Sequence, residues 1–100
     1  MPKQRQSKEL WALQRERVWK RDGSKCVRCA SQGIFTFVGL NECHIDHIRS
    51  GKLGTNLLSN LRTLCRRCHC LRADHRHQGM IAGALRDEII PYNWRELVWE

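Results

Sequence analysis

The sequence predicts a small α+β domain, in which helices at both ends flank a short region of strands. The chain has 100 residues, enough for one domain with a modest core. Apolar residues recur at helical spacing near both ends, whereas β-branched and aromatic residues gather in the middle. Two C-x-x-C pairs enclose that middle region and suggest that a bound metal compensates for the small core.

The N-terminal part predicts a basic, disordered arm over residues 1–6 and a helix over residues 7–21. Ser7 is a favourable N-cap, and the Asp-Gly pair at 22–23 supplies a glycine that ends a helix. The apolar face of this helix comprises Leu10, Trp11, Val18 and Trp19. Because the tryptophans share that face with aliphatic residues, we expect them to pack in the core rather than stack on bases.

The middle of the chain, residues 22–76, predicts the core of the domain. Segments 34–40 and 43–48 are bounded by polar residues and have strand-like composition, so we expect them to pair as a hairpin. A polar, glycine-rich loop follows, and the pattern becomes helical over residues 67–76.

The C-terminal part, residues 77–100, predicts a helical extension. A short helix fits residues 80–89, and Pro91 lies just beyond it because proline cannot continue a helix. The apolar residues after the proline, which we expect to pack against the rest of the domain, are Trp94, Leu97 and Val98.

Since the sequence has no internal repeat, we interpret residues 1–100 as a single domain.

Four cysteines predict a structural zinc site. Cys26 and Cys29 form one C-x-x-C pair, and Cys65 and Cys68 form a second. Each such turn directs two sulfur atoms at one cation, so two turns complete a tetrahedral four-thiolate site. The alternatives are redox-active pairs or cysteines that bind nothing. The two further cysteines, which we expect to be small buried apolar residues, are Cys43 and Cys70.

A second group of reactive side chains lies in the stretch NECHIDHI, residues 41–48. Asp46 and His47 are neighbours on a predicted strand, so their side chains point to opposite faces and can serve one reaction centre from two directions. His44 shares the face of Asp46, and whether it lines the site or only pairs within the strand stays open. His69 directly follows the second cysteine pair, so a bound zinc ion would fix the start of its helix.

In order along the chain, the segments WKRDGSKCVRC, IDHI and SNLRTLCRRCH resemble the HNH endonuclease family, whose active-site fold is called ββα-metal. The resemblance extends from about Val18 to Arg72, over half of the chain. It implies a small zinc-stabilised ββα-metal domain with flanking N- and C-terminal helices. Outside this stretch the sequence carries no motif that we can assign.

The resemblance implies a role for each matching residue. Asp46 and His69 match the two protein ligands of a catalytic divalent cation, which would be Mg²⁺, Mn²⁺, Ni²⁺ or Zn²⁺. His47 matches the general base that activates the attacking water. Asn60 matches the asparagine that hydrogen-bonds the backbone near that base. Some relatives carry a further histidine where this chain has Ala73, so water or substrate phosphate would complete the coordination shell.

The charge balance predicts a polyanionic partner. Eighteen Lys and Arg against ten Asp and Glu give a formal net charge of +8, which favours nucleic acid over a membrane. The residues expected to contact DNA phosphates are Lys25, Arg28, Arg62, Arg66, Arg67, Arg72 and Arg76. Phosphate contacts position a duplex without reading its sequence, so we expect low sequence specificity. For some of these residues the alternative is a solvated charged surface.

The chain lacks the features of a secreted or membrane protein. Its N-terminus has no apolar stretch typical of a secretory signal, and no apolar run is long enough to span a membrane. We therefore expect an intracellular, cytoplasmic protein in a reducing environment, where paired cysteines bind zinc rather than form disulfides.

The leading interpretation is a metal-dependent DNA endonuclease that nicks or cuts double strands, with the 5′-phosphate and 3′-hydroxyl ends that the resemblance implies. One alternative is a non-catalytic, zinc-dependent DNA-binding module. Another is an accessory subunit of a DNA-processing or packaging complex, since the family includes small phage and prophage proteins. The preferred ion, the cleavage site, the choice between monomer and dimer, and the roles of His44, His75 and His77 stay open.

Overall fold

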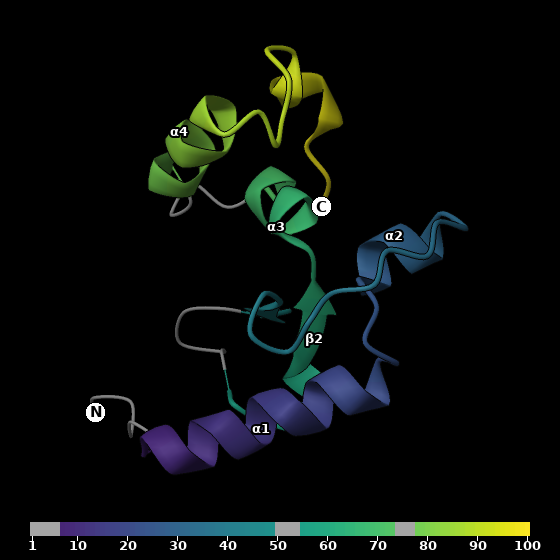
Figure 1. Ribbon diagram of the computed structural model, residues 1–100, viewed down its shortest axis with the longest axis vertical. Helices are drawn as coiled ribbons and strands as arrows, with labels where there is room; N and C mark the ends of the chain where they lie inside the picture. The colour runs from purple at the N-terminus through teal and green to yellow at the C-terminus, as the bar shows by residue number, and fades with distance from the viewer. Residues whose placement is uncertain (1–6, 50–54, 74–77) are drawn as a thin grey trace.

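The computed structural model of the chain describes residues 7–49, 55–73 and 78–100. Its elements in chain order are α1 (Lys8–Arg21), α2 (Val27–Ser31), β1 (His44–His47), the 3-10 turn η2 (Leu58–Asn60), β2 (Leu61–Leu64), α3 (Arg66–Leu71), α4 (Gln78–Arg86) and the 3-10 turn η4 (Trp94–Leu97). Helix α1 lies at one end of the molecule and α4 at the other, with the strands between them (Figure 1). The fold class is α+β, as predicted, and the predicted arm lies outside the described residues.

Helix α1 begins and ends where the sequence predicts. The Ser7 hydroxyl accepts a hydrogen bond from the Leu10 amide (3.2 Å), and Gly23 adopts a left-handed φ of +68° just beyond the last turn. The apolar face of α1 is only partly buried, because Val18 is fully enclosed whereas Leu10 is 55% exposed. The helix therefore contacts the sheet through a narrow strip of residues.

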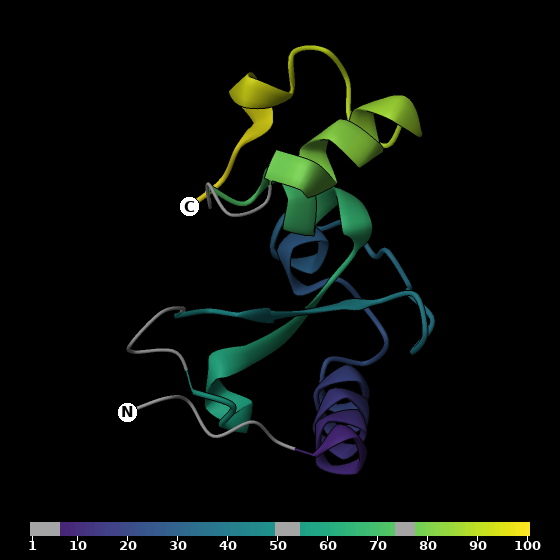
Figure 2. The ribbon, with the colours of Figure 1, turned by 90° about the vertical axis from the view of Figure 1, so that its left-hand side faces the viewer.

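The two-stranded sheet joins residues that are far apart in the sequence (Figure 2). Strand β1 runs antiparallel to β2. The predicted hairpin between segments 34–40 and 43–48 is therefore wrong, because the partner of β1 is β2. Segment 34–40 instead runs beside residues 24–26, where Lys25 and Phe37 form an isolated bridge. Strand propensity indicates an extended backbone, but long-range packing selects the partner.

Two buried clusters hold the helices and the sheet together. The first contains Cys26, Cys29, Leu64, Cys65 and Cys68, with Trp99 packed against it. The second lies mainly between α3 and α4 and contains Cys70, Leu71, Ala84 and Ile90. The predicted metal-binding residues are thus part of the core, so the interior of this small domain depends on them.

Helix α3 is shorter than predicted, because it ends at Leu71 rather than near Arg76. Arg72 is extended, with φ −65° and ψ 137°, and its backbone lies beside Trp99. The Trp99 amide donates to the Leu71 carbonyl, and the Ala73 amide donates to the Trp99 carbonyl. A contact with the C-terminal segment therefore replaces the next turn of the helix.

The C-terminal extension follows the prediction in outline. Helix α4 begins and ends slightly earlier than the predicted range of 80–89. Trp94 packs against the second cluster, as predicted, whereas Leu97 and Val98 are 36% and 39% exposed. Trp99 packs against both clusters and takes the role expected of those two residues. No helix in the described parts of the chain is long and apolar enough to cross a membrane.

Candidate active site and metal centre

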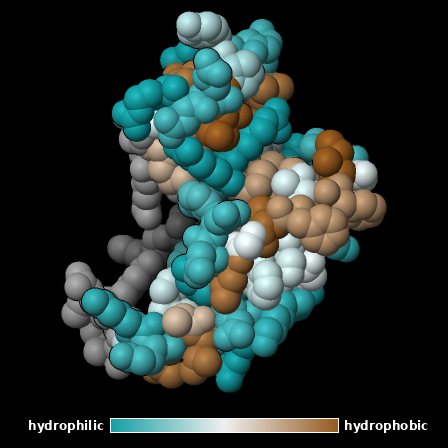
Figure 3. All heavy atoms as spheres, viewed as in Figure 1, coloured by the Kyte–Doolittle hydropathy of each residue, from teal (hydrophilic) through white to brown (hydrophobic). Residues whose placement is uncertain are grey.

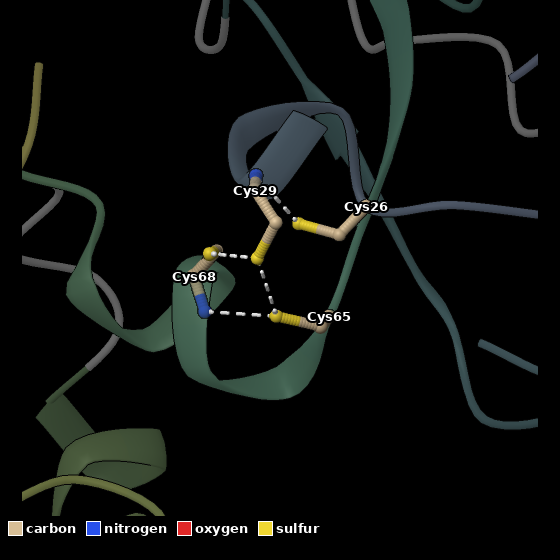
Figure 4. A group of neighbouring side chains, drawn as sticks. All are labelled: Cys26, Cys29, Cys65 and Cys68. Atoms are coloured by element: carbon tan, nitrogen blue, oxygen red, sulfur yellow. Dashed lines mark hydrogen bonds between the residues drawn. The ribbon is translucent and has the colours of Figure 1, made fainter. Parts of the chain in front are cut away.

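The four predicted zinc ligands lie together in one buried cluster (Figure 4). The sulfur atoms of Cys26, Cys29, Cys65 and Cys68 all lie within 4.8 Å of one another. The Cys29 sulfur is 4.0 Å from that of Cys65 and 3.5 Å from that of Cys68. In a tetrahedral site with zinc–sulfur bonds of about 2.3 Å, the sulfur atoms lie about 3.8 Å apart. The cluster therefore has dimensions compatible with a zinc ion.

Two short helices direct the cysteines into this cluster. Cys26 is the N-cap of α2 and Cys65 is the N-cap of α3, and each sulfur accepts a 3.5 Å hydrogen bond from the amide three residues later. Hydrogen bonds from Cys65 and Cys68 lower the pKa of Cys26, whereas the hydrogen bond to Cys26 raises the pKa of Cys65 to about 11. By themselves the thiols share negative charge unevenly, and a divalent cation would allow all four to ionise.

The remaining two cysteines lie outside this cluster, and both are buried as predicted. The Cys43 thiol donates to the Leu40 carbonyl (3.3 Å) and lies 3.6 Å from the Arg15 guanidinium. Cys70 belongs to the second core cluster, where burial raises the pKa of its thiol. Both residues therefore serve the packing of the core.

Asp46 is buried on β1, with 3% of its surface exposed, and positive groups surround it. Its Oδ2 accepts a hydrogen bond from Arg62 (2.8 Å), the residue opposite it in the sheet, and its Oδ1 accepts one from Arg72 (2.7 Å). Burial opposes ionisation, but hydrogen bonds from His69 and Arg62 and the charge of Arg72 outweigh burial and lower the pKa of Asp46. The site therefore contains a fixed, ionised carboxylate.

Asp46 and His69 have the spacing of two ligands of one cation. His69 Nε2 lies 3.5 Å from Asp46 Oδ1. Two ligand atoms about 2.1 Å from one ion lie about 3.0–3.4 Å apart at octahedral to tetrahedral angles. Among residues 7–49, 55–73 and 78–100, the four cysteines are the one group of three or more metal-binding side chains that gather this closely. An ion held by Asp46 and His69 would therefore need water or phosphate oxygens as further ligands.

His44 lies on the same side of β1 as Asp46 and contacts His69. The Nδ1 atoms of the two histidines are 2.9 Å apart, and their ring centroids are 4.9 Å apart. If His69 binds a cation through Nε2, its Nδ1 carries the proton and donates a hydrogen bond to Nδ1 of His44. The geometry therefore gives His44 a position from which it orients the His69 ring.

His47 lies on the opposite face of β1, as strand alternation predicts. Its Nε2 is 2.8 Å from Asn56 Oδ1, and its ring is parallel to that of Trp11, with centroids 6.0 Å apart. Because an amide oxygen can only accept, Nε2 carries the proton and Nδ1 is the nitrogen able to accept one. The sequence did not point to either contact: Trp11 was expected in the core, and no spacing links Asn56 to a histidine.

Asn60 connects the two ends of the loop between the strands. Its Oδ1 accepts from the Arg49 amide (2.9 Å), and its Nδ2 donates to the carbonyls of Arg49 (3.0 Å) and Thr55 (2.8 Å). Its own carbonyl accepts from the Ile48 amide (2.9 Å). Asn60 therefore holds the backbone directly after His47.

Replacing Asn60 by alanine is expected to lower the free energy of unfolding by about 1–3 kcal/mol, because three backbone groups lose their partners. Chemical denaturation of the zinc-loaded protein measures the change. Asn41→Ala is a matched control at an exposed position and should change the stability by less than about 0.5 kcal/mol. If Asn60→Ala costs no more than this control, Asn60 does not hold the loop.

The residues predicted to contact DNA phosphates occupy two kinds of environment. The partly or fully exposed ones are Lys25, Arg28, Arg66 and Arg67. In contrast, the side chains of Arg62 and Arg72 are only 13% and 12% exposed, and both turn toward Asp46. Arg76 lies outside the described residues. The partly or fully exposed residues contribute positive charge to the surface, whereas Arg62 and Arg72 belong to the candidate active site.

The surface around Lys25 is also hydrophobic. Hydrophobic side chains gather near α2 on the face shown in Figure 3. Ile34, Phe35 and Phe37 are all more than half exposed. The Lys25 ammonium lies 5.1 Å and 5.7 Å from the centres of the two phenylalanine rings. Cation–π contacts therefore hold this charge over an aromatic surface.

The fold is a small ββα domain, since the two strands lead into the helix that carries His69, and its four buried cysteines could bind a zinc ion. A sequence model of the HNH endonuclease family matches residues 26–77, over half of the chain. The chain therefore belongs to the HNH endonuclease family. No curated protein and no solved structure gives a significant match. Membership of this family indicates a nuclease or DNA-binding function.

Proposed function

We propose that this protein is a metal-dependent DNA endonuclease whose single domain is held together by a structural zinc ion. The observation that carries the proposal is a buried, ionised Asp46 paired with His69, next in sequence to His47, in a chain of the HNH family. The zinc would be bound by the four cysteines, and their near-tetrahedral spacing supports this assignment.

The catalytic cation, which would be Mg²⁺, Mn²⁺, Ni²⁺ or Zn²⁺, would be held by Asp46 and His69. Such an ion, when bound, stabilises negative charge on the phosphate and on the departing 3′ oxygen. Each Asp46 oxygen accepts one hydrogen bond, from Arg62 or from Arg72, through one of its lone pairs. The second lone pair of each oxygen can bind a cation. Their positive charges disfavour another cation nearby, so the catalytic ion should bind more weakly than the structural zinc.

His47 would accept the proton of the attacking water through Nδ1. The hydrogen bond with Asn56 keeps the proton on Nε2, and the parallel Trp11 ring fixes the plane of the imidazole. A base whose tautomer and ring plane are both fixed loses little free energy when it orients for the reaction. The chain therefore supplies both the base and the groups that orient it.

The substrate would be DNA, held mainly through its phosphates. The partly or fully exposed cations that fit this role are Lys25, Arg28, Arg66 and Arg67. Contacts of this kind imply low sequence specificity, and the family resemblance implies 5′-phosphate and 3′-hydroxyl ends. A monomer suffices for a nick, whereas a dimer would make a double-strand break easier. The small domain would suit a cytoplasmic phage or prophage protein that acts with a DNA-processing machine.

A non-catalytic DNA-binding module, or an accessory subunit of a DNA-processing complex, is the second candidate. One observation favours it, because Arg62 and Arg72 each donate a hydrogen bond to an Asp46 oxygen and so give the buried carboxylate a structural role. The Asp46 network would then be structural, and the cysteine cluster would organise a basic surface. The two candidates differ in whether any divalent ion supports hydrolysis.

Cleavage of supercoiled plasmid decides between these candidates. The zinc-loaded protein is incubated with plasmid and with added Mg²⁺, Mn²⁺, Ni²⁺ or Zn²⁺, and nicked and linear products are separated on a gel. The endonuclease proposal expects nicked or linear DNA with at least one ion. A protein that binds the plasmid but leaves it supercoiled with all four ions is a binding module, and the proposal is then lost.

His69→Ala is expected to retain about one zinc ion per chain but to lose more than about 100-fold in cleavage rate, because the catalytic ion loses one of two protein ligands. Metal analysis and the plasmid assay measure the two quantities. Cys70→Ala, one residue away on the same helix, is the matched control and should keep both zinc and activity. Loss of zinc from His69→Ala would instead place His69 in the structural site.

A further inference from the structure

The last two residues of the chain reach the arginines that hold Asp46. Arg62 donates from Nη1 and Nη2 to the two carboxylate oxygens of Glu100, each at 2.9 Å, and Arg72 Nε lies 3.3 Å from Glu100 Oε2. The same two guanidinium groups bind Asp46. Two positive and two negative side chains therefore form one network at the edge of the candidate active site.

Trp99 holds Glu100 in this position. The Trp99 indole donates to the Cys68 carbonyl (2.7 Å), which fixes the ring against α3. The guanidinium carbons of Arg28 and Arg62 lie 4.9 Å and 4.8 Å from the ring centre. None of these contacts involves the side chain of Glu100, so that carboxylate can move while the Trp99 ring stays in place.

Glu100 is the most accessible member of the network. Its side chain is 44% exposed, whereas Asp46 is 3% exposed. A surface hollow of about 480 Å³ lies beside it, and its lining includes Arg28, Arg62 and Trp99. The hydrogen bonds from Arg62 lower the pKa of Glu100, so the carboxylate is ionised at neutral pH. A solute anion can therefore replace Glu100 but cannot replace Asp46.

We propose that Arg62 and Arg72 form a binding subsite for a phosphate of the DNA backbone, and that the Glu100 carboxylate occupies this subsite until a phosphate displaces it. The inference rests on the proposed function, because it places that phosphate beside Asp46. Carboxylate and phosphate both present paired oxygens to a guanidinium fork, so the exchange conserves the hydrogen bonds. Asp46 keeps both arginines oriented after Glu100 leaves.

Glu100 thus acts as an internal competitor of the substrate. It neutralises the two arginines in the free protein, so any anion that binds them must first displace it. Removing its charge should therefore strengthen DNA binding. If Glu100 instead braces the arginines, removing its charge should weaken both binding and stability.

The test is Glu100→Gln, which has the same shape as glutamate but no charge. Its affinity for a short labelled duplex, measured by fluorescence anisotropy without added divalent ion, is expected to be about 3–10-fold tighter than that of the wild type. Glu88→Gln makes the same change in net charge at an exposed position and should tighten binding less than about twofold. Inorganic phosphate should also raise the Tm of Glu100→Gln more than that of the wild type.

Each outcome decides the proposal. If Glu100→Gln binds no more tightly than Glu88→Gln, or if it loses both affinity and Tm, Glu100 does not compete with phosphate and the proposal is overturned. If the wild type cleaves plasmid with none of the ions but Glu100→Gln still binds DNA and phosphate more tightly, the endonuclease function fails and the phosphate subsite stands.

Discussion

Replacement of His47 by alanine is expected to lower the rate of plasmid nicking by about 10²–10⁴-fold, the usual contribution of a general base. The reason is that the imidazole Nδ1, whose tautomer is set by Asn56, is the proposed acceptor of the water proton. Zinc content and DNA affinity should stay at wild-type levels, because the His47 side chain contacts Asn56 and Trp11, and the hydrogen bond from Arg72 goes to the His47 backbone carbonyl, which the substitution keeps. Initial rates of conversion of supercoiled to nicked plasmid measure the effect.

The matched control for this variant is Trp11→Phe, which keeps a ring beside His47 and should lose less than about tenfold in rate, because the base itself remains. Free imidazole should restore part of the activity of His47→Ala, since a small base can enter the space that the side chain leaves. A rate for His47→Ala within about threefold of the wild type would show that another group takes the proton.

Replacement of Cys65 by alanine is expected to have the largest effect on stability. Structural zinc contributes on the order of 10 kcal/mol, which is comparable with the whole folding free energy of a small domain. The Cys65 thiol also caps α3 and lies in the first core cluster, so its loss removes a metal ligand, an N-cap and packing together. The variant should contain no zinc and should unfold without a cooperative transition in circular dichroism.

Cys43→Ala is the matched control, since Cys43 is also buried but lies outside the cysteine cluster. It should keep about one zinc per chain and lose only about 1 kcal/mol, the cost of a small cavity. If Cys65→Ala retains stoichiometric zinc and a sharp unfolding transition, the four-cysteine assignment is wrong.

The elements that the sequence predicted well depend on residues close together in the chain. The C-x-x-C spacing places two sulfurs on one turn, and the structure brings the two turns into one cluster. The helix that begins after Ser7 follows from a local cap. Alternation along a strand separates Asp46 from His47, and each indeed contacts a different set of residues.

The sequence predicted poorly wherever two distant segments had to be matched. Segment 34–40 has strand-like composition, yet β1 pairs with β2, because composition does not select a partner. The helical pattern after Arg67 runs on past Leu71, but a contact with Trp99 ends the helix. The contacts of Arg62 and Arg72 with Asp46 also join distant segments, and no local pattern in the sequence predicts them.

The sequence by itself therefore determined which reactive side chains the chain carries and how they are spaced: four thiols in two turns, a carboxylate and two histidines on one strand, a histidine on a later helix, and an excess of basic residues. Only the tertiary structure decided which residues surround that chemistry. Asn56 and Trp11 fix His47, His44 contacts His69, and Glu100 pairs with the arginines that hold Asp46. Local geometry follows from backbone rules over a few residues, whereas these contacts depend on how the cysteine cluster and the core pack the whole chain.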